Sequence, residues 1–157
     1  MKFFEASNLY TLNKSTYVNL RWIAYSGQLI SILIVQFILG FKFNYFYCIL
    51  VVFFSVLTNL YLQFKLKENQ LNNFNSTIYL SYDILQLGLL FFFTGGITNP
   101  FIFLIIVPAV FSSQYLNIWS SAILVLFIII ILIFLSFFYL QLPHPDEIHF
   151  HVPDYYL

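Results

Sequence analysis

Long apolar stretches separated by short polar ones dominate the chain. The apolar stretches cover residues 22–39, 45–64 and 77–94, and another runs almost without interruption from 101 to 142. Stretches of about 18 or more apolar residues are typical of membrane-spanning helices. One straight helix over 101–142 would be about 60 Å long, twice the hydrocarbon core of a bilayer, so we expect a turn at the polar gap SSQYLN, residues 112–117.

The pattern therefore predicts an all-α protein, a polytopic transmembrane helical bundle with five spans, at about 22–39, 45–64, 77–94, 101–113 and 118–141. This transmembrane domain, residues 22–141, is expected to lie between an N-terminal tail, residues 1–21, and a C-terminal tail, residues 142–157. Pro108 falls inside the fourth predicted span, where it removes a backbone hydrogen bond and can kink the helix.

The basic residues predict which ends of the spans face the cytoplasm. Most of them lie before the first span or in the loop after the second, and one lies on the opposite side: Lys2, Lys14, Arg21, Lys65 and Lys67, against Lys42. An excess of Lys and Arg marks cytoplasmic segments, so the N-terminus and the 65–76 loop are predicted to be cytoplasmic and the C-terminal tail extracytoplasmic. Arg21 and Trp22 are interpreted as an anchor at the membrane interface.

Composition supports a membrane protein and narrows its function. The 157 residues are 61% hydrophobic and 8% charged, with a formal net charge of zero, so no basic surface for a nucleic-acid partner is expected. None of the common motifs for soluble catalysis occurs, so no catalytic residues are assigned. Cys48 is expected to be a buried, inert thiol, and no metal site is expected at His144, His149 and His151, which are interpreted as surface histidines.

The segment GGITNPF, residues 95–101, separates the third and fourth predicted spans. Gly95 and Gly96 suit a helix end with positive φ, and Asn99 followed by Pro100 suits a helix start, with Asn as N-cap and Pro in the first turn. A tight hairpin alone accounts for these residues. The alternative is a ligand site, because free N–H groups at the helix start and the Asn99 amide are uncharged donors beside Phe101 and the Phe91–Phe93 run. A membrane-soluble ligand with carbonyl oxygens, such as a quinone, suits that combination.

Asp83 is the one acidic residue within the predicted spans. An ionisable group there is costly and usually faces the bundle interior or water. Tyr79 and Gln86, at i−4 and i+3, share its helix face and are expected to be able to hydrogen-bond it. The cluster is interpreted as structural, with a role in signalling or protonation as the alternative.

The stretch SYDILQLGLLFFFTGGITNPFIFLIIVPAVFSS resembles the membrane domain of RegB/PrrB-type redox-sensing histidine kinases, whose signature is GGxxNPF between the third and fourth of six spans. The resemblance extends to Asp83, Gln86 and Pro108, and to LRWIAYSGQ at the first span. It implies a bacterial inner-membrane protein that binds ubiquinone and pairs with a second copy. The quinone-binding residues that it implies are Gly95, Gly96, Asn99, Pro100 and Phe101.

The same resemblance implies a cytoplasmic protein-histidine kinase that phosphorylates a response regulator. The sequence shows neither the sixth span nor the kinase core with its phosphorylated histidine and ATP-binding domain. We therefore expect either part of a longer kinase or a solitary input module, with enzymatic activity undecided. The alternative function is a small transporter or channel subunit with GGITNPF as a structural hairpin, although paired broken helices and several intramembrane charges are missing. A membrane enzyme acting on isoprenoids would need more acidic residues to hold metal ions.

Overall fold

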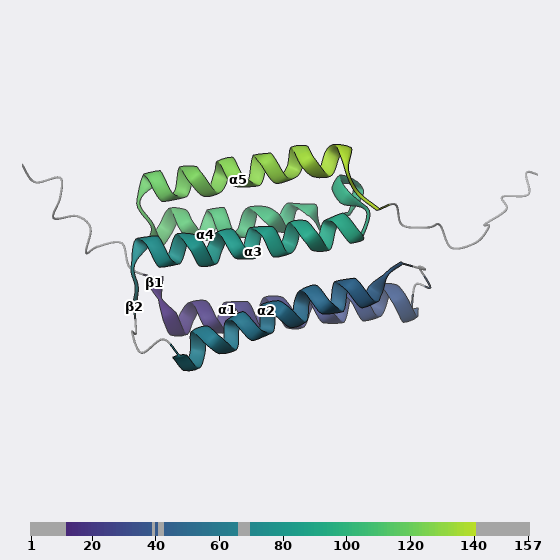
Figure 1. Cartoon of the computed structure of the whole chain (residues 1–157), viewed down its shortest axis with the longest axis horizontal. Helices are drawn as coiled ribbons and strands as arrows, with labels where there is room; N and C mark the ends of the chain where they lie inside the picture. The colour runs from purple at the N-terminus through teal and green to yellow at the C-terminus, as the bar shows by residue number, and fades with distance from the viewer. Residues whose placement is uncertain (1–11, 39, 41–42, 66–69, 141–157) are drawn as a thin grey trace, which may run out of the picture.

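The computed structural model describes residues 12–38, 40, 43–65 and 70–140. Helices dominate this part of the chain, which confirms the all-α class (Figure 1). The long helices are α1 (Lys14–Leu33), α2 (Tyr45–Lys65), α3 (Asn73–Phe93) and α5 (Ile118–Phe137), with the shorter α4 (Val107–Tyr115) between the last two. A π-helical segment, η2 (Ile34–Ile38), extends α1, and two short 3₁₀ helices, η3 (Gly96–Thr98) and η4 (Ile102–Ile106), lie between α3 and α4.

The helices run roughly parallel to a common axis in two groups (Figure 1). α1 packs on α2, α3 packs on α5 and α4, and contacts between α2 and α3 join the groups. At one end two short strands, β1 (Leu12–Asn13) and β2 (Gln70–Leu71), pair antiparallel with Leu12 opposite Leu71. At the other end lie η3 and the end of α5 (Figure 1). The loop after α3 and the segment after α5 therefore share one end of the bundle.

In the part of the chain that the structure describes, four helical segments are long and apolar enough to cross a membrane: Lys14–Ile38, Tyr45–Phe64, Asn73–Phe93 and Ile118–Phe137. The fourth predicted span corresponds to the shorter apolar segment Ile102–Tyr115, formed by η4 and α4. Its 3₁₀ and α-helical residues together extend about 24 Å, less than the hydrocarbon core of about 30 Å. It nevertheless leads the chain back along the bundle to the end where α5 begins (Figure 1).

The first helix begins earlier than the sequence pattern predicted. Residues 14–21, expected in the N-terminal tail, form the first turns of α1, because the Asn13 side chain accepts hydrogen bonds from the backbone N–H groups of Ser15 and Thr16. Asn72 and Asn117 cap α3 and α5 in the same way. Each such cap contributes about 1 kcal/mol to helix stability. Three asparagines thus fix the helix starts at the β1–β2 end.

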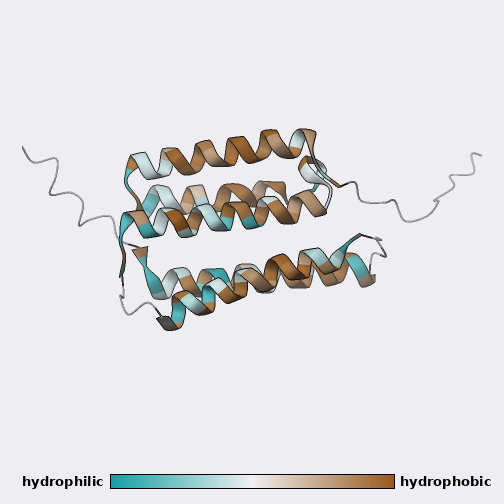
Figure 2. Cartoon of the chain, viewed as in Figure 1, coloured by the Kyte–Doolittle hydropathy of each residue, from teal (hydrophilic) through white to brown (hydrophobic). Residues whose placement is uncertain are grey.

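The outward faces of the bundle are strongly apolar. Hydrophobic residues extend along α2 and α5, whereas hydrophilic ones lie mainly toward the β1–β2 end (Figure 2). Large side chains such as Phe53, Phe64 and Ile118 are exposed on the isolated chain. Inside, small residues let helices approach closely: a Cβ added at Gly88 in α3 would lie 2.8 Å from Cγ2 of Ile131 in α5. A multi-pass membrane protein accounts for both features, because lipid covers the outside.

Pro108 does not kink a continuous span. It stands in the first turn of α4, directly after η4, where a missing backbone N–H costs little. At the position where the sequence predicted a kink, the chain therefore changes from a 3₁₀ helix to an α-helix.

Candidate functional site

The GGITNPF loop makes a compact turn at the end of α3. Gly95 has φ 102° and Gly96 has φ 61°, so the positive φ expected of both glycines is confirmed. Thr98 and Asn99 donate their backbone N–H groups to the carbonyl oxygens of Gly95 and Gly96, which forms η3. Among the residues that the structure describes, the N–H groups of Gly95, Gly96 and Ile97 have no hydrogen-bond acceptor. The loop thus keeps a short row of unused backbone donors.

Asn99 holds the loop together with its side chain. Its Nδ2 donates to the carbonyl oxygen and to Oγ1 of Thr94, at 2.9 and 2.8 Å, and its Oδ1 accepts from the N–H of Phe101 at 2.8 Å. Both amide hydrogens are therefore used within the loop, so the free Asn99 donor expected from the sequence is not present. The Asn99 side chain accepts a hydrogen bond from a backbone N–H that follows it in the chain, as an N-cap would. The helix that follows is the 3₁₀ helix η4, however, and the α-helix begins only at Val107.

The segment after α5 closes over the glycines, a contact that the sequence analysis missed. Gly96 is buried, and a Cβ added there would lie 2.5 Å from Cβ of Tyr139. Leu140 then donates its N–H to the carbonyl oxygen of Phe92 at 2.9 Å. Phe101 and Ile97 remain 47% and 46% exposed, so the accessible side of the loop is apolar.

A second polar site lies inside the bundle around Asp83. Its carboxylate pairs with Nη2 of Arg21 at 3.0 Å and accepts hydrogen bonds from the hydroxyls of Tyr17 and Tyr25. Arg21 Nε donates to the Tyr25 hydroxyl at 2.7 Å, and Nη2 also donates to Oγ1 of Thr58 in α2 at 2.9 Å. The pair joins α1 to α3 and reaches α2, so it ties the two helix groups together.

This geometry corrects the interpretation of Arg21 as an interface anchor. Arg21 is only 3% exposed, and the Asp83 side chain is 13% exposed. A charge is tolerated at this depth because its countercharge and several hydrogen-bond partners are within reach. The signal in the sequence was the spacing of Tyr17, Arg21 and Tyr25, which places all three on one helix face at i, i+4 and i+8.

The residues predicted to accompany Asp83 lie elsewhere. Gln86 donates from Nε2 to Oε1 of Gln28 in α1 at 2.7 Å, which adds another polar link between α1 and α3. Tyr79 lines a groove next to the cluster. Of the described residues, those that hydrogen-bond the Asp83 carboxylate come from α1, because that helix presents its polar face to α3.

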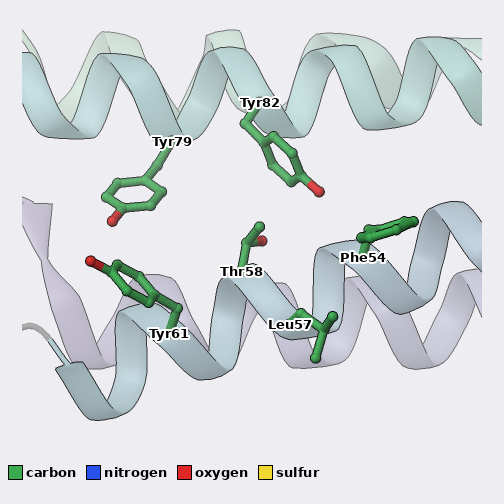
Figure 3. A pocket seen from close by; sticks show the side chains of 6 residues that line it. All are labelled: Phe54, Leu57, Thr58, Tyr61, Tyr79 and Tyr82. Carbon is green, nitrogen blue, oxygen red and sulfur yellow. The ribbon is translucent and has the colours of Figure 1, made fainter.

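The groove lies between α2 and α3 and has a volume of about 600 Å³. Aromatic and aliphatic side chains line it together with one threonine, and the hydroxyls of Tyr61 and Tyr79 point toward the same space from opposite helices (Figure 3). The lining residues are Phe54, Leu57, Thr58, Tyr61, Tyr79 and Tyr82. His144, His149 and His151 lie outside the described residues, so their interpretation as surface histidines stays a prediction.

The fold and these two sites define a polytopic helical membrane domain with a buried ion pair and an uncharged loop at one end. Over 139 residues, 88% of its length, the chain is 35% identical to the sensor histidine kinase RegB of Cereibacter sphaeroides. The resemblance to this kinase seen in the sequence is thereby confirmed, and the chain spans about 30% of the length of that relative. No protein-family model matches the chain. No solved structure matches it either.

Proposed function

We propose that this chain is the membrane input module of a two-component sensor histidine kinase and that it senses the quinone pool through the GGITNPF loop. The observation that carries the proposal is the match to RegB, because a match of 139 residues within 157 must include residues 95–101. The kinase activity belongs to a part that the chain does not cover, and a response regulator would be reached through that part. The module resides in the bacterial inner membrane with its N-terminus in the cytoplasm and works as a homodimer.

The geometry of the loop supports ubiquinone as the ligand. The N–H groups of Gly95, Gly96 and Ile97 are the proposed donors for a carbonyl oxygen, with Ile97 the exposed one of the three, and the exposed Phe101 ring of the same loop is the proposed apolar wall. Asn99 holds the turn through its own hydrogen bonds, and Pro100 stays part of the proposed quinone-facing loop. Because N–H groups carry a partial positive charge, their attraction to the head group increases as that group gains electron density. Binding at this place is therefore sensitive to redox state.

The proposal predicts that Phe101 contributes to affinity and a neighbouring phenylalanine does not. Phe101→Ala removes the stacking wall and should weaken binding of short-chain ubiquinone by about ten-fold, equivalent to about 1.4 kcal/mol. Phe103→Ala is the matched control, because Phe103 is also exposed, at 58%, and lies outside the loop. Binding would be measured by titration of the chain in lipid nanodiscs. Equal affinity of both variants and the unchanged protein would refute the assignment of this loop.

A further inference from the structure

The groove between α2 and α3 lies within the part of the bundle that a bilayer would bury. Tyr79 and Tyr82 follow Asn73, the first residue of α3, by six and nine positions, or about 9 and 14 Å at 1.5 Å per residue. The oxygen atoms of phospholipids stay in the headgroup region, outside the hydrocarbon core of about 30 Å. The Tyr82 end of the groove is therefore out of reach of ordinary lipid head groups.

A buried guanidinium stands directly beside this groove. Nη2 of Arg21 donates to Thr58, and the guanidinium carbon lies 5.9 Å from the ring centroid of Tyr82, so two lining residues contact it. Nη1 of the same group is buried and has no hydrogen-bond partner among the described residues. An unsatisfied donor in an apolar environment is unfavourable, and a ligand acceptor that reached it would remove that cost.

The charges around the guanidinium decide what kind of acceptor fits. Asp83 already neutralises Arg21 at 3.0 Å, so an anionic ligand would be repelled by the carboxylate without a free countercharge. A neutral carbonyl oxygen has no such penalty. The aromatic walls formed by Tyr61, Tyr79 and Tyr82 suit a flat ring, and the open side between the helices lets an apolar tail extend into lipid (Figure 3).

We propose that this groove is a second binding site for the head group of a membrane quinone, with the Arg21 guanidinium as the donor to one carbonyl oxygen. The identity of the ligand rests on the proposed function, but the site is separate from the loop. Tyr82 and Gly95 are thirteen positions apart on α3 and its extension, or about 20 Å. The site lies toward the opposite half of the bilayer, and two of its lining residues, Thr58 and Tyr82, contact the Arg21 guanidinium of the ion pair that joins α1 to α3.

The test uses a photoreactive azido derivative of a short-chain quinone, added to membranes that contain the full chain, followed by mapping of the labelled peptides. We expect label on α2 and α3 between residues 54 and 82, and excess unmodified quinone should suppress it. Leu57→Trp fills the groove and should reduce that label about ten-fold. Leu50→Trp is the matched control, because Leu50 is also exposed on α2 but lies two turns from Leu57 and about one turn beyond Phe54, outside the groove. It should leave the label unchanged.

The outcomes separate the two proposals. Label confined to residues 95–103 would overturn the groove site and leave the loop assignment standing, whereas label confined to the groove would do the reverse. Label at neither place would overturn both. Groove label that quinone does not suppress, or that both tryptophan variants reduce equally, would show a nonspecific lipid contact and overturn the groove site. So would loss of dimer cross-linking in Leu57→Trp alone, because a second copy would then occupy the groove.

Discussion

Removing one partner of the Arg21–Asp83 pair should be costly, and the two possible removals should differ. At 3.0 Å the attraction between the charges is about 5 kcal/mol for an effective dielectric constant of about 20. Asp83→Leu leaves a guanidinium that cannot lose its charge, at a place where it is 3% exposed. Such an uncompensated buried charge typically costs 3–5 kcal/mol, so we expect a loss of about 4 kcal/mol in the free energy of unfolding.

Arg21→Met should be less damaging. The remaining Asp83 carboxyl can take up a proton and become neutral, and it keeps the hydroxyls of Tyr17 and Tyr25 as partners. We expect a loss of about 2 kcal/mol for this variant. The double variant Arg21→Met/Asp83→Leu leaves no charge behind, so its loss should be smaller than the sum of the two single losses by at least about 2 kcal/mol.

The assay is reversible unfolding in mixed micelles with an increasing fraction of denaturing detergent, which gives the free energy of unfolding of each variant. Gln63→Leu serves as a control for the loss of an exposed polar side chain, since the Gln63 side chain accepts a long hydrogen bond, 3.4 Å, from Trp22 near the end of α2 and its backbone carbonyl bond to Lys14 is kept. Strictly additive losses, or a larger loss for Arg21→Met than for Asp83→Leu, would refute the interpretation of this pair as a desolvated contact between helices.

Two further predictions concern glycines. Gly96→Ala should destabilise the protein by about 2 kcal/mol more than Gly40→Ala. Both residues have positive φ, but among the described residues a Cβ at Gly96 would meet Tyr139 and one at Gly40 would meet nothing within 4 Å. Equal losses in the same unfolding assay would contradict this. Gly88→Ala should cost about 1–3 kcal/mol through its contact with Ile131, and Ile131→Ala should recover part of that loss when the two changes are combined. If the double variant lost more stability than the two single variants lose together, close packing between α3 and α5 would be contradicted.

Much of the architecture could be predicted because the lengths and positions of the apolar stretches determine where the membrane-spanning helices lie. The apolar stretches located α2, α3 and α5 closely, and the chemistry of glycine predicted the positive φ of Gly95 and Gly96. The start of α1 was missed, although Asn13 stands where an N-cap is needed. Hydropathy does not detect such a cap, and a span counted from its first apolar residue begins too late.

The contacts between distant segments could not be predicted in the same way. The side chains that face Asp83 are determined by how α1 is rotated about its axis and by the helices next to it. The sequence does not give this rotation, so Arg21 was interpreted only from its position near the end of a predicted span. Tyr139 meets Gly96 only because α5 ends beside η3, more than forty positions along the chain from the glycine. The role of Asn99 changed for a local reason, because Thr94 offered two acceptors within reach of the amide.

The contact between Tyr139 and Gly96 connects the GGITNPF loop to the segment that follows α5. Since Leu140 is also hydrogen-bonded to Phe92, the end of α3 and the backbone after α5 are joined directly at this end of the bundle. A displacement of this turn is therefore expected to displace Tyr139 and Leu140, just after the end of α5, as well.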